Sequence, residues 1–153
     1  MVTVTVRRAT PDDAAVWLRM RQALWPEDDG DPGHADEIAQ YFAGTIKEPL
    51  EVLLAVDEEG AAVGFAELSI RNHAEDCVTD RVAYLEGWYV ADGYRRRGVG
   101  RMLVEAAERW GREQGCTEFG SDALIENDVS AAAHLALGFE ETARIRCFKK
   151  SLS

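Results

Sequence analysis

Hydrophobic and polar residues follow two different periods along the first part of the chain. Val2–Arg8 alternates valine with threonine or arginine, which predicts a strand with one buried face. The Thr10–Pro11 pair then provides an N-cap and a first helical position, and apolar residues at helical spacing follow as far as Pro26. After an acidic loop at Glu27–Gly33, the same spacing predicts a second helix over His34–Thr45.

The middle of the chain contains three apolar runs that are too short for helices. Val52–Val56 and Ala62–Ile70 are separated by an acidic turn that ends in glycine, which predicts a β-hairpin. Val82–Val90 is a longer strand, interrupted by Glu86 and Gly87. A glycine inside such a strand often marks a bulge or a close approach of other groups, so we expect an irregularity there.

The last part of the chain returns to helical spacing. Gly100–Gln114 is strongly amphipathic and is followed by Gly115, a typical helix stop. We then expect a strand at Thr117–Ala123, a helix of small residues at Val129–Leu137 and a final strand at Ile145–Lys149.

This order of elements, β-α-α-β-β-β-α-β-α-β, predicts a fold of the α/β (α+β) class with a mixed sheet and helices on its faces. We found no internal repeat, low-complexity run or Ser/Gly linker, and therefore expect one domain over residues 1–153. A hydrophobic content of 46% is sufficient for a buried core at this length.

Charge is distributed unevenly along the chain. Residues 1–92 hold 19 acidic and 7 basic side chains, whereas residues 93–153 hold 9 acidic and 10 basic ones, for a net charge of −11 overall. This balance disfavours nucleic-acid binding, which needs a basic face. It favours a cationic partner on the N-terminal side, although solubility alone would also explain the acidity.

The cysteines and the hydropathy pattern suggest a compartment. Cys77, Cys116 and Cys147 are widely spaced and contain no Cys-x-x-Cys pair, so we expect free thiols and no metal site. No apolar stretch approaches the length of a membrane span or of a signal-peptide core. We therefore expect a cytoplasmic protein that does not contact a membrane.

The segment from Arg95 to Arg101 carries the clearest chemical signal. It lies between a predicted strand and a predicted helix, where unpaired backbone N–H groups carry the positive end of the helix dipole. Gly98 and Gly100 allow a diphosphate to approach these amides, and the arginines add charged contacts. Without its context, the same segment could also be a glycine-punctuated loop whose basic side chains are solvated.

In its context the segment resembles motif A of the GNAT family of N-acetyltransferases. There Arg-x-x-Gly-x-Gly, here Arg95–Gly100, follows a bulged strand, here Tyr84–Val90, and binds the pyrophosphate of acetyl-CoA. Leu137–Phe139 matches the Leu-Gly-Phe that precedes the last strand in that family. The resemblance covers essentially the whole chain and implies a mostly antiparallel sheet, flanked by helices and splayed at the acetyl-CoA site. It implies coenzyme contacts from Trp88, Tyr89, Val90, Arg95, Arg96, Arg97, Gly98, Val99, Gly100, Arg101 and Asn127.

A narrower resemblance connects the chain with the aminoglycoside 6′-N-acetyltransferases. It rests on Leu24–Pro26, Tyr84–Trp88, Trp110–Gly111, Gly115–Cys116, Ser121–Asp122 and Leu137–Glu141. The resemblance implies direct acetyl transfer in a ternary complex to the 6′-amine of an aminoglycoside antibiotic, and a homodimer. It also implies that the acceptor pocket is lined by Trp25, Glu86 and Asp122.

Each of these three residues also has a structural interpretation. Glu86 interrupts an apolar strand, where a carboxylate needs a partner or a wet cavity; a salt bridge with Arg71 or Arg81 is the alternative to an acceptor role. Asp122 follows a strand and is otherwise a turn or helix cap. The two carboxylates together would bind ammonium groups and accept a proton. Trp25 either stacks on a sugar or is simply a core or surface aromatic.

His134 occupies the position where many GNAT enzymes have a tyrosine that protonates the leaving thiolate. Imidazole can donate a proton near neutral pH, although a histidine that is hydrogen-bonded on a helix face is the simpler interpretation.

Two other functions of the chain stay open from the sequence. One is acetylation of a different amine, such as a polyamine, a peptide N-terminus or a lysine, and the other is a coenzyme-A-sensing module without turnover.

Overall fold

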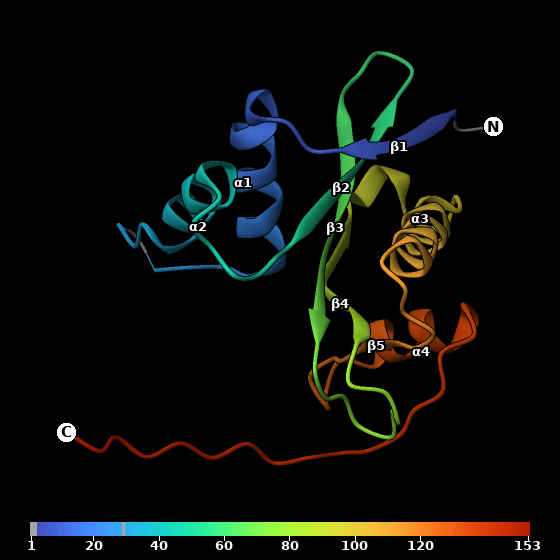
Figure 1. Cartoon of the computed structure of the whole chain (residues 1–153). Helices are drawn as coiled ribbons and strands as arrows, with labels where there is room; N and C mark the ends of the chain where they lie inside the picture. The colour runs from blue at the N-terminus through green and yellow to red at the C-terminus, as the bar shows by residue number, and fades with distance from the viewer. Residues whose placement is uncertain (1–2, 29) are drawn as a thin grey trace.

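The computed structural model describes residues 3–28 and 30–153, which form one five-stranded sheet in the order β1-β2-β3-β4-β5 (Figure 1). The first four strands pair antiparallel, and β5 pairs parallel to β4. The strands are β1 (Val4–Arg8), β2 (Glu51–Asp57), β3 (Ala62–Arg71), β4 (Val82–Val90) and β5 (Phe119–Ser121).

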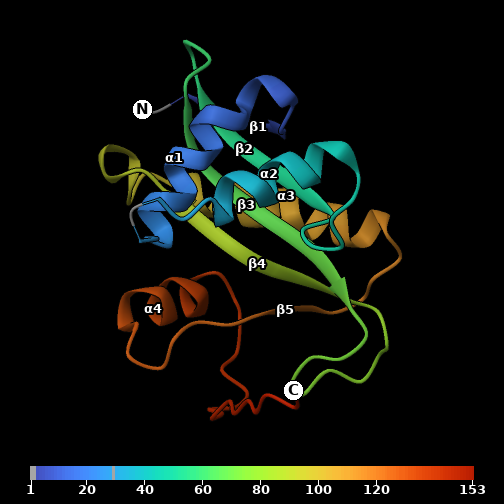
Figure 2. The same ribbon diagram turned by 90° about the vertical axis from the view of Figure 1, so that its left-hand side faces the viewer.

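Helices cover both faces of this sheet. Figures 1 and 2 show α1 and α2 on one face and α3 on the other, with α4 beside β5 at the far end. Among the described residues no helix is both long and apolar enough to cross a bilayer. The helices are α1 (Ala14–Leu24), α2 (Gly33–Ala43), α3 (Val99–Glu113) and α4 (Asp128–Ala136), with 3₁₀ turns at Pro11–Asp13 and Asp92–Tyr94.

The alternation of side chains along the strands creates two separate cores. In β2, Leu53 and Ala55 pack towards α3, whereas Val52, Leu54 and Val56 pack towards α1 and α2. This explains why β2 has an apolar run without polar alternation: both of its faces are covered. The sheet is therefore the middle layer of three.

Two irregularities near the middle of β4 open the sheet. Glu67 pairs with Gly87 but Leu68 pairs with Leu85, so Glu86 has no partner in the register and forms the bulge that the sequence predicts. β5 pairs with β4 only over Ala83–Leu85, while β4 continues to Val90. The strands therefore separate directly after Leu85, at the level of the bulge.

The predicted final strand at Ile145–Lys149 is wrong: no strand is assigned there, and residues 140–153 are exposed along their whole length. Its residues have strand propensity, but a strand also needs a neighbour to complete its hydrogen bonds. The remaining predicted elements are present, with ends that differ by a few residues; Val2 lies outside the described residues. Cys116 is buried, whereas Cys147 is exposed, and all three cysteines are free thiols.

The start of α1 is held by a salt bridge whose contribution depends on pH. Asp13 accepts hydrogen bonds from Arg7 Nη1 at 2.8 Å and from the Thr10 N–H at 2.7 Å. The Arg7 hydrogen bond is the main reason why the pKa of Asp13 falls from 3.8 to about 2. Because the folded pKa is lowered, the stabilisation is present above pH 4 and disappears as the pH falls towards 2.

We expect Asp13→Asn to lower the free energy of unfolding by about 1–2 kcal/mol at pH 7, after allowance for the solvent exposure of Arg7. Urea unfolding at pH 7 and at pH 2 measures this difference. The two proteins should become equally stable at the lower pH. A difference that is the same at both pH values would contradict the ionic origin of the effect.

Candidate active site

The turn predicted to bind pyrophosphate lies between β4 and α3. Gly98 caps α3 with a left-handed φ of 82°. The first helical hydrogen bond runs from the Met102 N–H to the Gly98 carbonyl at 3.0 Å, so the N–H groups of residues 99–101 have no helical acceptor. These amides, at the positive end of the helix dipole, form a binding site for an anion.

The two glycines of the turn keep it accessible in different ways. A Cβ on Gly98 would have no atom within 4 Å, so the space in front of the turn is open. A Cβ on Gly100 would lie 3.1 Å from Trp88 Cζ2, so this glycine lets the Trp88 ring pack against the start of α3. Val99 is 1% exposed, and its side chain belongs to the core under α3. Val99 can therefore offer a ligand only its backbone.

Within the described part of the chain, Arg95 is the arginine of this turn whose side chain makes polar contacts with the rest of the protein. Arg95 Nε donates to the Val90 carbonyl at 2.8 Å, and its guanidinium forms a 2.8 Å ion pair with Asp92 and lies 5.9 Å from the Tyr89 ring centroid. It therefore braces the end of β4. The side chains of Arg96, Arg97 and Arg101 are exposed at the turn.

Trp88 supplies a test of whether a coenzyme fits beside this turn. Its Nε1 is buried and has no hydrogen-bond partner within the described part of the chain. A buried donor without an acceptor is rare in native structures and fits a ligand carbonyl. The anion site, the open glycine and this donor fit a coenzyme that carries both a diphosphate and amide groups. The individual coenzyme contacts of these residues stay predictions.

His134 lies on α4 with both ring nitrogens in hydrogen bonds. Nδ1 lies 2.7 Å from the Ser130 carbonyl, which can only accept, so Nδ1 carries a proton; Nε2 lies 2.8 Å from Ser121 Oγ. Both partners also suit the protonated ring, so the geometry is compatible with proton transfer, and the role stays a prediction.

Asn127 Oδ1 accepts from the Ser130 N–H at 3.1 Å and caps α4, which gives this predicted coenzyme contact a structural function.

Glu86, the bulged residue, is held by an arginine. Arg71 donates from Nε at 2.9 Å and from Nη2 at 2.6 Å, and the Ser69 hydroxyl donates to the same carboxylate. The hydrogen bonds to Glu86 raise the pKa of Arg71 above its usual range. The salt bridge that the sequence offered as an alternative role for Glu86 is therefore present, with Arg71 rather than Arg81.

Asp122 is held from the opposite side of this pair. The Tyr84 hydroxyl donates to Asp122 Oδ2 at 2.6 Å, and the Arg71 guanidinium lies 3.6 Å from the Tyr84 ring centroid. Burial and the Asp122 hydrogen bond raise the pKa of Tyr84 well above its usual value, so it remains a donor at any assay pH. Glu86 and Asp122 are thus connected through Arg71 and Tyr84, and Asp122 is exposed.

A hollow of about 590 Å³ lies beside Arg71 at the C-terminal end of β3. Its lining includes Arg71 and the acidic side chain of Glu48. The site itself combines an exposed carboxylate, Asp122, and a paired carboxylate, Glu86, at the point where β4 and β5 separate. This arrangement suits a polar ligand that carries positive charge.

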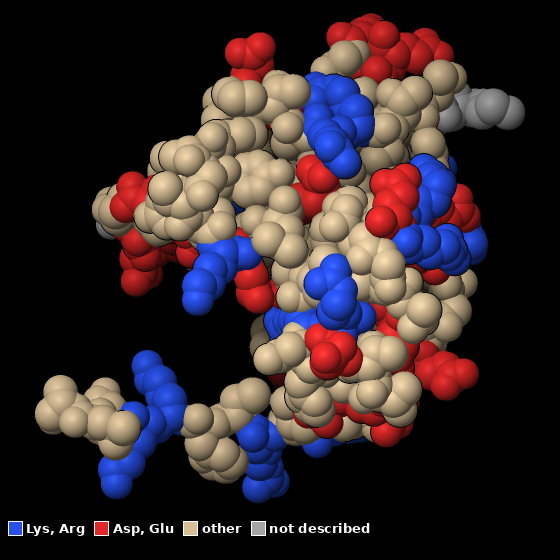
Figure 3. All heavy atoms as spheres, viewed as in Figure 1, with Lys and Arg blue, Asp and Glu red and all other residues tan. Residues whose placement is uncertain are grey.

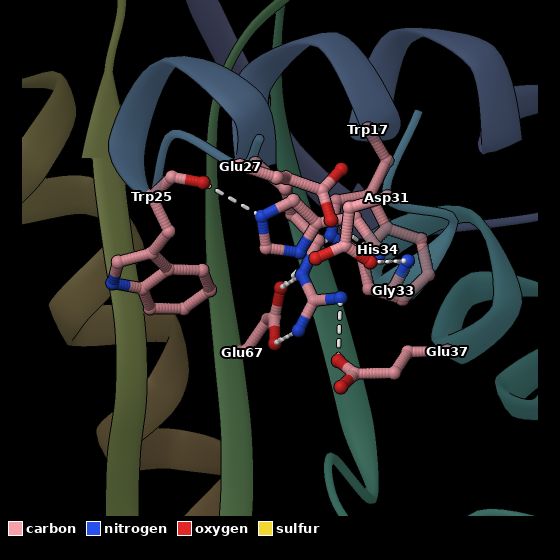
Figure 4. A network of polar contacts seen from close by, with 9 residues as sticks. Trp17, Trp25, Glu27, Asp31, Gly33, His34, Glu37 and Glu67 are labelled. Atoms are coloured by element: carbon pink, nitrogen blue, oxygen red, sulfur yellow. Dashed lines mark hydrogen bonds and ion pairs between the residues drawn. The ribbon is translucent and has the colours of Figure 1, made fainter. Parts of the chain in front are cut away.

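Trp25, directly after α1, lies over the same part of β4. Its indole rests on Gly87: a Cβ there would be 2.4 Å from Trp25 Cη2. The Trp25 carbonyl accepts from His34 Nε2 at 2.7 Å, which connects the start of the α1–α2 loop to α2 (Figure 4). The three predicted acceptor residues therefore lie at or next to the bulge, and their contacts with an acceptor stay predictions.

The sequence did not reveal that Tyr84 donates a hydrogen bond to Asp122, and it gave Arg71 only as one of two possible partners for Glu86. A signal for both was present. Ser69 and Arg71 lie two residues apart on β3, and Tyr84 and Glu86 lie two apart on β4, so each pair shares a face. Only the strand register shows that these faces adjoin.

The sequence matches the acetyltransferase (GNAT) family over residues 17–139. The chain therefore belongs to the GNAT family of acetyltransferases. The mixed sheet that opens beside a glycine-rich helix start is the arrangement that the resemblance implied, and the fold prediction is confirmed.

Several relatives carry a specific name. The chain is 52% identical over 147 residues to an aminoglycoside N(6′)-acetyltransferase type 1 of Klebsiella aerogenes, covering 96% of each chain. It is 42% identical over 149 residues to one of Stenotrophomonas maltophilia, covering 97% of this chain and 94% of that one.

Solved structures agree with these relatives. An aminoglycoside antibiotic 6′-N-acetyltransferase from Acinetobacter baumannii superposes with a TM-score of 0.87 at 36% identity, over 99% of this chain and 100% of that one. Another aminoglycoside acetyltransferase, solved with the bisubstrate analogue CoA-S-monomethyl-acetylneamine, superposes with a TM-score of 0.86 at 33% identity, over 97% of this chain and 99% of that one.

Proposed function

We propose that this chain is an aminoglycoside 6′-N-acetyltransferase that uses acetyl-CoA and thereby confers resistance to the antibiotic. The observation that carries the proposal is the polar group around Asp122 and Glu86, which lies where β4 and β5 separate and includes an exposed carboxylate. Relatives that share 52% and 42% of its residues and bear this activity in their names support the same conclusion.

In the proposed reaction the acceptor amine attacks acetyl-CoA, and three residues of the chain bind and orient the acceptor. The amine of the acceptor is itself the nucleophile, so transfer is direct in a ternary complex and no covalent enzyme intermediate is needed. Asp122 is the exposed carboxylate and receives the substrate ammonium, whose proton leaves to it or through water. Glu86, already paired with Arg71, lines the pocket, and Trp25 forms a wall against the sugar.

On the donor side, the turn at Gly98–Arg101 binds the diphosphate and the N–H groups of β4 near Val90 polarise the thioester carbonyl. Acetyl-CoA supplies an activated acyl group. The ring of His134 is held between Ser121 and Ser130, and it protonates the thiolate of coenzyme A as this leaves. Acetyl-CoA is a cytoplasmic metabolite, which supports a cytoplasmic location for the enzyme. The Asp/Glu excess of residues 1–92 supports a cationic acceptor rather than a nucleic acid.

The experiment that tests this function is an acceptor panel. Release of the coenzyme A thiol is followed with kanamycin, spermine, a peptide with a free N-terminus and a lysine peptide, and the mass of the product identifies the amine that is acetylated. We expect turnover with kanamycin at its 6′-amine, and intersecting initial-rate lines. A preference for spermine or a peptide would assign another GNAT acceptor, and thiol release with none of them would indicate a binding module.

We also propose that the chain forms a homodimer through its C-terminal segment, residues 140–153. This segment is exposed throughout and runs clear of the molecule, and Figure 3 shows basic side chains along it. Ile145, Phe148 and Leu152 are 62%, 90% and 92% exposed. The far edge of β5 ends the sheet, beside a hollow of about 230 Å³ between β5 and α3. Exchange of this segment between two copies would give it a strand partner and bury its apolar residues.

Sedimentation of the full chain tests the dimer. We expect the mass of two chains for the parent, and dissociation at micromolar concentration for Phe148→Glu. Leu50→Glu is the matched control, because Leu50 is 51% exposed just before β2, three strands away from β5, and it should leave the mass unchanged. A parent that sediments as one chain would refute the proposal.

A further inference from the structure

A buried ion pair stands in the layer between the sheet and the helices α1 and α2. Arg21 of α1 donates from Nε at 2.8 Å and from Nη2 at 3.3 Å to the carboxylate of Glu67 on β3 (Figure 4). Trp17 Nε1 donates to the same carboxylate at 3.0 Å. Glu67 is 2% exposed and Arg21 is 6% exposed.

Such a pair is costly to bury. Removing two charges from water consumes most of their attraction, and well-packed apolar side chains in the same place are often equally or more stable. Burial raises the pKa of Glu67, while the Arg21 charge and the Trp17 hydrogen bond act in the opposite direction. Stability alone therefore gives little reason for this pair, and its neighbours indicate a different function.

Arg21 connects four parts of the acceptor side of the molecule. Its Nη1 lies 2.7 Å from Glu37 on α2, and its guanidinium carbon lies 5.4 Å from the ring centroid of Trp25 and 5.8 Å from that of Trp17. Figure 4 shows these groups around one guanidinium, with Trp25 on the side of β4. One side chain thus fixes α1, α2 and the first residue of the loop between them to β3.

The position of Glu67 on β3 makes this connection specific. Glu67 pairs with Gly87, the residue next to the bulged Glu86, and Gly87 is the residue on which the Trp25 indole rests. The ion pair therefore holds α1 to β3, and the aromatic contact holds the residue after α1 to β4, at one level of the sheet. A shift of Arg21 would move Trp25 relative to Glu86.

We propose that Arg21 and Glu67 are positioning residues of the acceptor site, which hold the Trp25 indole on Gly87 and thereby set the wall that the aminoglycoside contacts. The inference rests on the acceptor role proposed above for Trp25. It predicts that disturbing the pair changes acceptor binding more than turnover or coenzyme binding.

The test uses the double variant Arg21→Met/Glu67→Gln, which leaves no unpaired buried charge, together with Arg21→Lys. We expect the KM for kanamycin to rise about five- to tenfold in the double variant, which is the scale of one aromatic contact. We expect kcat and the calorimetric Kd for acetyl-CoA to stay within about twofold. Arg21→Lys, which keeps the charge, should recover part of the KM. Asp13→Asn is the matched control for general destabilisation of α1, and its KM should equal that of the parent.

A second measurement reports on Trp25 directly. Protein labelled with 5-fluorotryptophan has four ¹⁹F resonances, one for each tryptophan, which single Trp→Phe variants assign. In the double variant the Trp25 resonance should shift, while that of Trp110, on the α3 side, should not. An unchanged Trp25 resonance would overturn the positioning proposal even if kanamycin is acetylated normally. A shifted resonance with an unchanged KM would overturn the link to the acceptor. A parent without activity on any aminoglycoside would instead refute the proposed function.

Discussion

Asp122→Asn is expected to lower kcat/KM for kanamycin by about a hundredfold, while the Kd for acetyl-CoA stays nearly unchanged. A positioned proton acceptor contributes about 10²–10⁴-fold to a rate, and a hydrogen bond to a charged group contributes about 1.5–3 kcal/mol to binding. Asp122 is the exposed carboxylate of the site, and asparagine keeps its shape and the Tyr84 hydrogen bond. Steady-state kinetics with kanamycin and calorimetry with acetyl-CoA measure the two quantities.

Glu86→Gln tests the other carboxylate and should act in a different way. Its loss leaves the Arg71 charge without its partner beside a site for a cationic substrate, so we expect a higher KM for kanamycin. Glu118→Gln is the control, because Glu118 is also a hydrogen-bonded carboxylate but accepts from Thr79 in a loop contact outside the site. Its kcat/KM for kanamycin should equal that of the parent. Unchanged kcat/KM in both Asp122→Asn and Glu86→Gln would refute the assigned roles.

Gly98→Ala should weaken acetyl-CoA binding by about tenfold or more, which corresponds to the loss of at least one charge-assisted hydrogen bond. Gly98 has a φ of 82°, which turns the chain so that the N–H groups of residues 99–101 form the anion site, and alanine disfavours that conformation by about 1–2 kcal/mol. Its methyl group would also enter the open space in front of the turn. Isothermal titration with acetyl-CoA gives the change in Kd.

Gly60→Ala is a close control for this substitution. Gly60 has a φ of 83° and likewise no atom within 4 Å of an added Cβ, but it lies in the β2–β3 turn. Both variants should lose about 1–2 kcal/mol of stability in urea unfolding, because both strain the backbone in the same way. Only Gly98→Ala should lose affinity for acetyl-CoA. Equal Kd values for the two variants would contradict the diphosphate site at this turn.

The chain of contacts at the bulge illustrates how far sequence reasoning reaches. Glu86 and Gly87 interrupt an apolar run, and this alone predicts a bulge and a need for a partner. The identity of that partner depends on the register between β3 and β4, which sets Arg71 against Glu86. Glu67 interrupts β3 in the same way, but its partner Arg21 is 46 residues away on a helix, and no local pattern relates the two.

The prediction of a final strand was wrong for a related reason. Strand propensity is a property of Ile145–Lys149 itself, but pairing depends on whether another strand edge is within reach. Within the described part of one chain no strand pairs with it, and its side chains are exposed. The proposed exchange between two copies would reconcile the sequence pattern with the structure.

The sequence by itself determined the order of the elements from β1 to α4, the glycine-rich helix start, the interruption of β4 and the family to which the chain belongs. These features depend on neighbours in the chain, through side-chain periodicity, glycine conformations and the unpaired amides of a helix start. Only the tertiary structure decided that Arg71 holds Glu86, that Tyr84 holds Asp122 and that Arg21 joins Glu67 to Trp25. Those contacts join residues far apart in the chain, so they depend on strand register and helix packing, which a one-dimensional pattern does not contain.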